Sequence, residues 1–255
     1  MIEIVKVENK DQEREFVMFP FSLYKGCDYW VPPIISEELE SMDKEKNPVF
    51  ENAEAEFYIA KKDGVTVGRI AAMVNWVEIE EQKKNKLRFG WYDTIDDLEV
   101  SKKLLESVIE FGKKRKLEFV DGPVGFSNMD KAGLLIEGYE ELNTMITWYH
   151  YPYQKEHLKK LGFSKLAEWV EYKIKIFSAE DAPEKVKKFS KIIQQRYELK
   201  VLNFKSRKEI IPYVDKMFEL LNVTYSNLQT YVTIKQYQID FYKEKFIKYI
   251  HPDFI

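Results

Sequence analysis

The sequence lacks the features that mark several common classes of protein. Its 255 residues include a single cysteine, Cys27, which excludes a disulfide-stapled scaffold and a thiolate metal cluster within one chain. No apolar run approaches the roughly 20 residues that a membrane-spanning helix needs. The first residues, Met1-Ile2-Glu3-Ile4, do not form the basic segment and apolar core of a signal peptide. We therefore expect a cytoplasmic protein with no membrane partner.

The chain also lacks a charge excess of either sign. Forty Lys and Arg against 43 Asp and Glu give a net charge of -3, without the basic surplus typical of nucleic-acid binders, so we expect no nucleic-acid partner. The three histidines, His150, His157 and His251, are too scattered to predict a metal site. Hydrophobic residues at 45% and aromatic residues at 15% exclude a disordered protein.

Hydrophobic periodicity predicts an alternating series of strands and helices in the first part of the chain. Strands are expected over residues 2–7, 56–60, 66–75, 87–95, 117–120 and 169–176. Helices are expected over residues 11–24, 36–46, 96–116 and 153–161. Asp63-Gly64 supplies the tight turn of a hairpin. Helices that interrupt strands predict a mixed α/β fold with one sheet.

The second part of the chain repeats the opening order of the first. After a linker come a helix over 184–196, a strand over 199–204 and helices over 208–225 and 234–250. We therefore predict a domain over 1–177, a linker and helix over 178–198, and over 199–255 the start of a second module that is truncated. The aromatic face of its helices lacks a sheet to cover, which predicts self-association or packing against a missing C-terminal module.

Several short segments, taken together with the element order, resemble one superfamily. They are Tyr29–Pro33, Asn47-Pro48, Ala53–Phe57, Gly68–Ala72, Gly133–Gly138 and Leu161-Gly162-Phe163. The first 177 residues are similar to GCN5-related N-acetyltransferase (GNAT) domains, and more narrowly to a bacterial group of tandem GNAT-like proteins of poorly defined activity. The resemblance implies a mixed, mostly antiparallel sheet flanked by helices. It also implies acyl transfer from acetyl-CoA or another acyl-CoA to a small-molecule or peptide amine.

The cofactor turn that the resemblance implies is degenerate in this sequence. The family holds the CoA pyrophosphate on backbone N–H groups where the fourth strand meets the third helix, through an Arg/Gln-x-x-Gly-x-Gly/Ala turn. Here that junction runs from Trp91 and Tyr92 to Asp97, with no glycine after Gly90 and no basic residue before Lys102. Its carboxylates suit the start of a helix and would repel a polyanion. Trp91, Tyr92 and Asp97 remain the candidates for contact with a cofactor.

Two residues are candidates for proton transfer in acyl transfer to an amine. Glu56, on the first strand of the hairpin, is a possible general base, and the alternative is a solvated strand edge. Many members of the family place a tyrosine general acid four residues before the glycine of Leu-Gly-Phe, where this chain has Leu158. Tyr153 could replace that tyrosine if the helix starts differently; otherwise it covers the edge of the domain.

The loop over residues 122–130 follows a buried strand, a common place for a ligand in α/β sheets. Gly125, Ser127, Asn128 and Asp130 could orient a small ligand there, or the loop could be a plain ordered connection. Two functions follow. The first is an N-acyltransferase whose first module is degenerate. The second is a non-catalytic protein that keeps the fold and binds a small ligand between the splayed central strands, or another protein.

Overall fold

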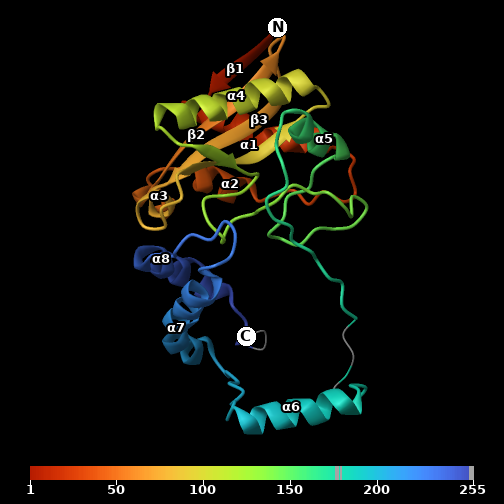
Figure 1. Cartoon of the computed structure of the whole chain (residues 1–255), viewed down its shortest axis with the longest axis vertical. Helices are drawn as coiled ribbons and strands as arrows, with labels where there is room; N and C mark the ends of the chain where they lie inside the picture. The colour runs from red at the N-terminus through yellow and green to blue at the C-terminus, as the bar shows by residue number, and fades with distance from the viewer. Residues whose placement is uncertain (176–177, 179, 253–255) are drawn as a thin grey trace. The chain divides into compact units, whose positions relative to one another are not determined.

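The computed structural model describes residues 1–175, 178 and 180–252 (Figure 1). The chain forms two compact units, each discontinuous in sequence. Unit 1 comprises Met1–Trp169 and Asn222–Gln238, and unit 2 comprises Val170–Leu221 and Ile239–Ile255. Within the described residues, none of the helices combines the length and the hydropathy required to cross a bilayer. The predicted domain boundaries at 177 and 198 stay predictions.

Unit 1 is built on one five-stranded sheet with the order β1-β2-β3-β4-β5. Four strands pair antiparallel and the fifth, a short one, pairs parallel with β4; they are β1 (Ile2–Lys6), β2 (Ala53–Lys62), β3 (Val65–Asn75), β4 (Lys86–Thr94) and β5 (Phe119–Asp121). The hairpin turn uses positive φ angles at Asp63 and Gly64, as their sequence indicates. The predicted mixed, mostly antiparallel sheet is thus confirmed.

Helices cover both faces of the sheet (Figure 1). α1 (Lys10–Leu23) and α2 (Ile35–Met42) pack on one face, where the core includes Phe57 and Met73. α4 (Leu98–Lys114) and α5 (Pro152–Lys160) pack on the other. Because side chains alternate along a strand, residues of β2 and β3 contribute to the two cores in turn. A short helix α3 (Trp76–Glu80) and a 3₁₀ turn η1 (Pro48–Glu51) complete the elements of this region.

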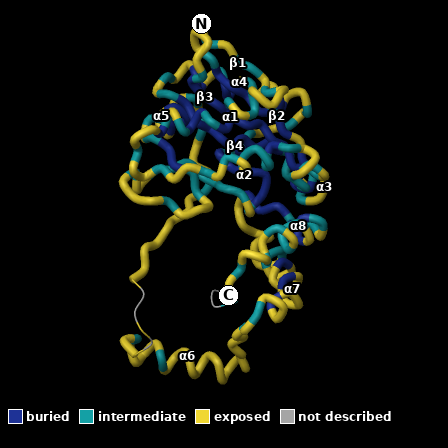
Figure 2. The backbone as a smooth tube through the Cα atoms, turned by 180° about the vertical axis from the view of Figure 1, so that it is seen from behind, coloured by how far each residue is buried: buried dark blue, intermediate teal, exposed yellow. Residues whose placement is uncertain are grey.

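Unit 2 is mainly helical. It contains α6 (Glu184–Arg196), most of α7 (Arg207–Tyr225), the end of α8 (Gln236–Phe246) and the turn η2 (Ile247–Tyr249). Lys243 of α8 forms an ion pair with Asp215 of α7. The rings of Phe218 and Tyr242 stack with their centroids 6.1 Å apart. No residue of α6 is buried, as the exposed colour along this helix shows (Figure 2).

Two predicted strands are wrong. Residues 169–175 form no strand, and Ile176, the last residue of that prediction, lies outside the described residues. The segment 199–204 forms none either. Both segments alternate in sequence like strands, but nearly all their residues are exposed. A strand exists only where its backbone groups pair with a neighbour, and along these described residues no such pairing forms.

Candidate functional site

A cavity of about 300 Å³ lies in unit 1 at the end of α1, on the α1 and α2 face of the sheet. Its walls are largely aromatic, formed by Tyr24, Tyr29, Trp30, Trp148 and Tyr149. Exposed apolar side chains at its mouth are Val31, Ile34 and Met145. The cavity is at the lower end of the size range of small-molecule sites and has their usual apolar lining. Its polar groups decide what it can bind.

The deepest of these polar groups form a closed set around Asp93. Arg69 Nε donates to Asp93 Oδ2 at 2.7 Å, and both side chains are buried. Arg69 also donates to the carbonyl of Phe16 at 3.1 Å. The hydroxyl of Tyr24 donates to Asp93 Oδ1 at 2.7 Å. Burial and the charge of Asp93 raise the pKa of Tyr24 well above its usual value, so Tyr24 stays a neutral donor.

A β-bulge in β4 brings Asp93 to this face. Arg69 lies opposite Asp93, whereas Ala71, two residues on, lies opposite Gly90, three residues back. The extra residue is accommodated at Trp91, whose φ is 47°. Because one inserted residue reverses the facing of those that follow it, Asp93 lies on the same face as Arg69. The bulge therefore creates the buried pair at the floor of the cavity.

Two further charged residues, Glu38 and Lys131, line the cavity and have hydrogen-bonding capacity that the described residues do not satisfy. Glu38 Oε2 accepts a hydrogen bond from Trp91 Nε1 at 2.7 Å, which is the only side-chain bond of Glu38 within the described part of the chain. Lys131 is partly buried, and its amino group has no hydrogen bond or ion pair among the described residues. Burial lowers the pKa of Lys131, while the charge of Glu38 acts in the opposite sense.

This combination of aromatic faces and carboxylates suits an organic ammonium group. Cations bind over the faces of Trp and Tyr rings within about 6 Å. Glu38 has a free oxygen with which to accept a charge-assisted hydrogen bond. The chain could therefore bind and orient an amine here. Among the described residues no group of His, Cys, Asp and Glu side chains could hold a metal ion.

The junction of β4 and α4 does not fit a CoA pyrophosphate. Asp97 is the N-cap of α4, and its Oδ1 accepts from the N–H of Glu99 at 3.0 Å. Lys62 is paired with Asp97 at 3.1 Å. Asp96 Oδ1 lies 3.2 Å from Nε2 of His157. The helix start is thus already capped by a carboxylate in an acidic setting, which disfavours a polyanion.

Beyond its short pairing with β5, strand β4 has backbone carbonyls that accept hydrogen bonds from other groups of the chain. The carbonyl of Phe89 accepts from Val124 N at 2.8 Å, that of Tyr92 from Gln154 Nε2 at 3.2 Å, and that of Thr94 from the hydroxyl of Tyr153 at 2.7 Å. Tyr153 is therefore committed to a backbone contact, and burial raises its pKa. Tyr92 points to the α4 face, where its hydroxyl donates to Ser101 at 2.9 Å. Of the three residues predicted to contact a cofactor, Trp91 is connected to the cavity, because its indole N–H donates to Glu38, which lines the cavity.

Glu56 lies on the opposite face of the sheet from the cavity. It accepts from the hydroxyl of Tyr58 at 2.5 Å and pairs with Lys6 at 2.9 Å. Burial alone would raise the pKa of Glu56, but these two partners outweigh it and lower the pKa. A carboxylate stabilised in this way is a weaker base, and it does not face the residues that line the cavity.

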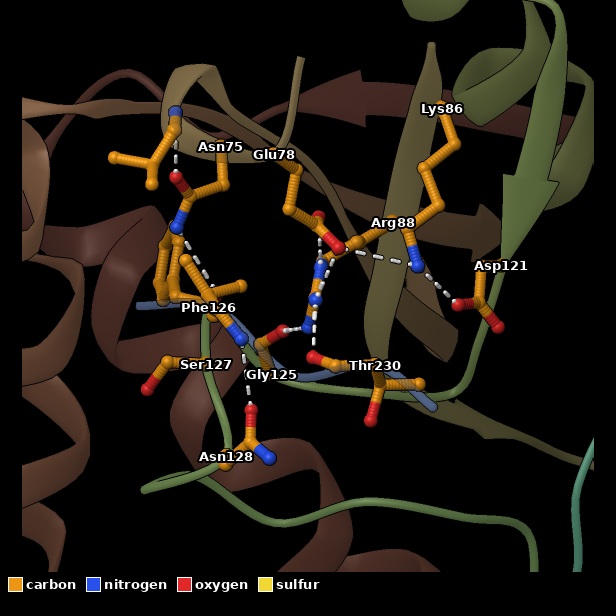
Figure 3. A network of polar contacts seen from close by, with 12 residues as sticks. Asn75, Glu78, Lys86, Arg88, Asp121, Gly125, Phe126, Ser127, Asn128 and Thr230 are labelled. Atoms are coloured by element: carbon orange, nitrogen blue, oxygen red, sulfur yellow. Dashed lines mark hydrogen bonds and ion pairs between the residues drawn. The ribbon is translucent and has the colours of Figure 1, made fainter. Parts of the chain in front are cut away.

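A buried charge network supports the loop over 122–130 (Figure 3). Arg88 Nε and Nη2 each donate to Glu78 at 2.7 Å, and Lys86 bridges Glu78 and Asp121 at 3.2 and 2.7 Å. Arg88 also donates to the carbonyls of Gly125 at 3.0 Å and Thr230 at 2.6 Å. The network therefore ties the loop and the segment 222–238 to the end of the sheet.

Polar groups of the predicted ligand loop bond within unit 1. Asp130 Oδ2 accepts from the N–H of Ser127 at 2.9 Å, and Ser127 Oγ accepts from the N–H of Met129 at 3.1 Å. Asn128 Oδ1 accepts from Val232 N at 3.0 Å. A Cβ on Gly125 would lie 2.2 Å from Cβ of Asp130, so the turn is tight. The loop brings these four residues together, and their bonds are those of an ordered connection.

Sequence reasoning missed the residues that line the cavity's polar floor. These are Tyr24, Glu38, Arg69, Asp93 and Lys131. A signal was present in two of them, because Arg69 and Asp93 stand inside runs of apolar residues that read as central strands. A charge buried in a sheet requires a partner, so two such charges of opposite sign in neighbouring strands predict a pair.

Comparisons with known proteins give weak similarities. No family model matches the chain. It is 26% identical over 249 residues to Protein YghO of Escherichia coli (strain K12), covering 96% of this chain and 61% of that protein. It is 22% identical over 174 residues to a bacterial ceramide synthase of Caulobacter vibrioides (strain NA1000 / CB15N), covering 68% of this chain and 45% of that one. The chain spans less than two thirds of the length of either relative.

Among solved structures, the chain is similar to a predicted acetyltransferase with acetyl-CoA from Clostridium acetobutylicum. The TM-score is 0.41 at 13% identity, covering 68% of this chain and 96% of that one. A likeness this weak carries no function to the present chain. The order of elements in unit 1, with α1 and α2 before the hairpin and α4 after β4, nevertheless resembles that of the GNAT superfamily.

Proposed function

We propose that the chain takes part in acyl transfer to an amine, and that the cavity of unit 1 holds the amine acceptor. The observation that carries this proposal is the placement of Glu38, with an oxygen free to accept, beside an aromatic cavity wall. The ammonium group lies against Glu38 and the faces of Trp30 and Trp148. The apolar part of the acceptor packs toward the exposed apolar mouth.

The name of one of the two relatives supports an amide-forming reaction. Ceramide is the amide of a long-chain amine, so a ceramide synthase joins an acyl group to such an amine. The exposed apolar residues Val31, Ile34 and Met145 at the mouth suit an acceptor with an alkyl or aromatic tail. This supports an acceptor that is amphiphilic.

The chain's own residues bind and orient the amine. Tyr24 and Arg69 fix Asp93, and the bulge at Trp91 fixes Glu38 through the indole N–H. The amine can attack only after its ammonium form has lost a proton, and Glu38 is placed to accept that proton. Holding the acceptor in one orientation then accelerates its attack on an acyl thioester supplied at the mouth of the cavity, which forms the amide and releases the thiol. Because the β4 and α4 junction does not fit CoA, we assign no step to a thioester bound there.

The second candidate is a protein that binds an amine without catalysing a reaction. The capped junction at Asp97 and the occupied edge of β4 favour it. Incubation of the chain with phenethylamine and S-acetyl-N-acetylcysteamine, an acyl thioester that lacks the CoA pyrophosphate, separates the two candidates. Amide formation supports catalysis, and binding without amide formation supports the second candidate.

Calorimetric titration of phenethylamine into the full chain tests the binding site itself. We expect saturable binding that 2-phenylethanol, its neutral analogue, does not reproduce. Trp148→Ala and Trp30→Ala should each weaken binding by about five- to thirtyfold, the equivalent of about 1–2 kcal/mol for a lost cation–π contact. Trp169→Ala, at an exposed tryptophan that does not line the cavity, is the matched control and should leave binding unchanged. Equal binding by all variants would refute the site.

A further inference from the structure

Four charged side chains line the cavity of unit 1. Arg69 and Asp93 form an ion pair, which is called the closed pair here, whereas Glu38 and Lys131 each keep hydrogen-bonding capacity that the described residues do not satisfy. Asp93 is bonded through both oxygens, to Arg69 and Tyr24. Glu38 uses one oxygen, and the amino group of Lys131 uses none of its donors within the described part of the chain. The amino group of Lys131 is therefore available to an anionic group of a ligand that enters the cavity.

We infer that the acceptor carries an acidic group beside its amine, as an α-amino acid does, with Lys131 binding the anion and Glu38 the ammonium. Lys131 and Glu38 line the same cavity but form no ion pair with each other. They are close enough for the charge of Glu38 to act on the pKa of Lys131. In a zwitterion of this kind the ammonium nitrogen and the carboxylate carbon are two bonds apart, so one ligand can pair with both side chains.

The closed pair explains why Lys131, and not Arg69, is assigned to the anion. Arg69 is fixed by Asp93 and by the carbonyl of Phe16, so its charge is already compensated. The ammonium group of Lys131 is a compact donor on a flexible four-carbon chain, so it can adjust its position to an anion in the cavity. The aromatic walls then receive the side chain of the amino acid.

This inference rests on the proposed function, and a matched pair of probes separates the two. L-phenylalanine and phenethylamine differ only in the carboxylate, and both are titrated into the full chain by calorimetry. We expect L-phenylalanine to bind at least about tenfold more tightly, the value of a hydrogen bond between charged groups. Lys131→Met should remove that advantage, so that the two probes bind with similar affinity. Lys131→Arg, which keeps the charge, should retain part of it.

The control variant is Lys114→Met, at an exposed lysine of α4 that pairs with Glu110. It should change neither affinity. If phenethylamine binds as tightly as L-phenylalanine, and Lys131→Met leaves their ratio unchanged, the inference is overturned while the amine site stands. If neither probe binds the folded chain, the proposed function falls, and this inference falls with it. Circular dichroism of Lys131→Met confirms that a lost affinity is not a lost fold.

Discussion

Arg69 of β3 and Asp93 of β4 meet at 2.7 Å across the centre of the sheet, 24 residues apart in sequence. Their side chains are 4% and 8% exposed, so the ion pair is almost completely removed from water. The pair depends on the bulge at Trp91, and it forms the floor of the cavity. The β-bulge in β4 therefore determines which charged side chains line the cavity.

Breaking this pair should destabilise the protein strongly. Asp93→Leu leaves Arg69 buried without its carboxylate, and removal of one partner of a buried pair costs about 3–5 kcal/mol. Urea unfolding of the variant measures the loss of unfolding free energy. The double variant Arg69→Met/Asp93→Leu should recover much of it, because the unpaired charge is then gone.

The exposed pair of Lys114 and Glu110 on α4 is the control for this cycle. Glu110→Gln should cost about 0.5 kcal/mol or less, since exposed ion pairs contribute little. A loss at Asp93 no larger than the loss at Glu110 would show that the buried pair does not hold β3 and β4 together.

The fold of unit 1 could be predicted largely because its elements are locally encoded. The Asp63-Gly64 turn and the apolar stripe of α4 each specify their element without reference to distant residues. The segments 169–175 and 199–204 show the limit of this reasoning. Their alternation permits a strand, but only a neighbouring edge can make one, and alternation does not specify that neighbour.

The site could not be predicted in the same way, because it depends on register. Arg69 and Asp93 are brought face to face by a bulge, and a shift of one residue would place Asp93 on the other side of the sheet. The prediction of Glu56 and Tyr153 as candidates rests on their positions along the chain. The structure places Glu56 on the α4 face and bonds Tyr153 to the carbonyl of Thr94.

A buried histidine should make the stability depend on pH. Burial lowers the pKa of His150 from 6.5 to about 4, and the ring is 1% exposed. As the pH falls through 6.5, the unfolded chain binds a proton at His150 that the folded chain does not bind. The free energy of unfolding should therefore fall by about 2 kcal/mol between about pH 7 and about pH 5 through this group.

Urea unfolding of the protein and of His150→Gln at both pH values isolates that contribution. The carboxylates titrate alike in the two proteins, so the difference between their pH dependences belongs to His150. Equal pH dependence in both proteins would mean that His150 is protonated as readily in the folded chain as in the unfolded one.

The network around Arg88 should control the order of the loop over 122–130. Arg88→Leu removes the donors to Gly125 and Thr230 and leaves Glu78 with Lys86 alone. We expect a loss of about 3–5 kcal/mol in stability. We also expect faster hydrogen exchange at the amide of Val232 and at those of residues 124–127.

Arg115→Leu is the matched control, because Arg115 bonds the half-exposed Glu54 away from this loop. It should leave the exchange of residues 124–127 unchanged. If Arg88→Leu also left it unchanged, the loop would be ordered by its own turns and not by the network.

The most direct test of the central claim is a parallel titration of phenethylamine and acetyl-CoA into the same folded chain. The claim is that unit 1 holds an amine in the cavity beside Glu38, and that the capped start of α4 at Asp97 does not hold CoA. It predicts saturable heat with the amine that Glu38→Gln diminishes, and no heat above dilution with acetyl-CoA. Stoichiometric binding of acetyl-CoA with no binding of the amine would contradict it.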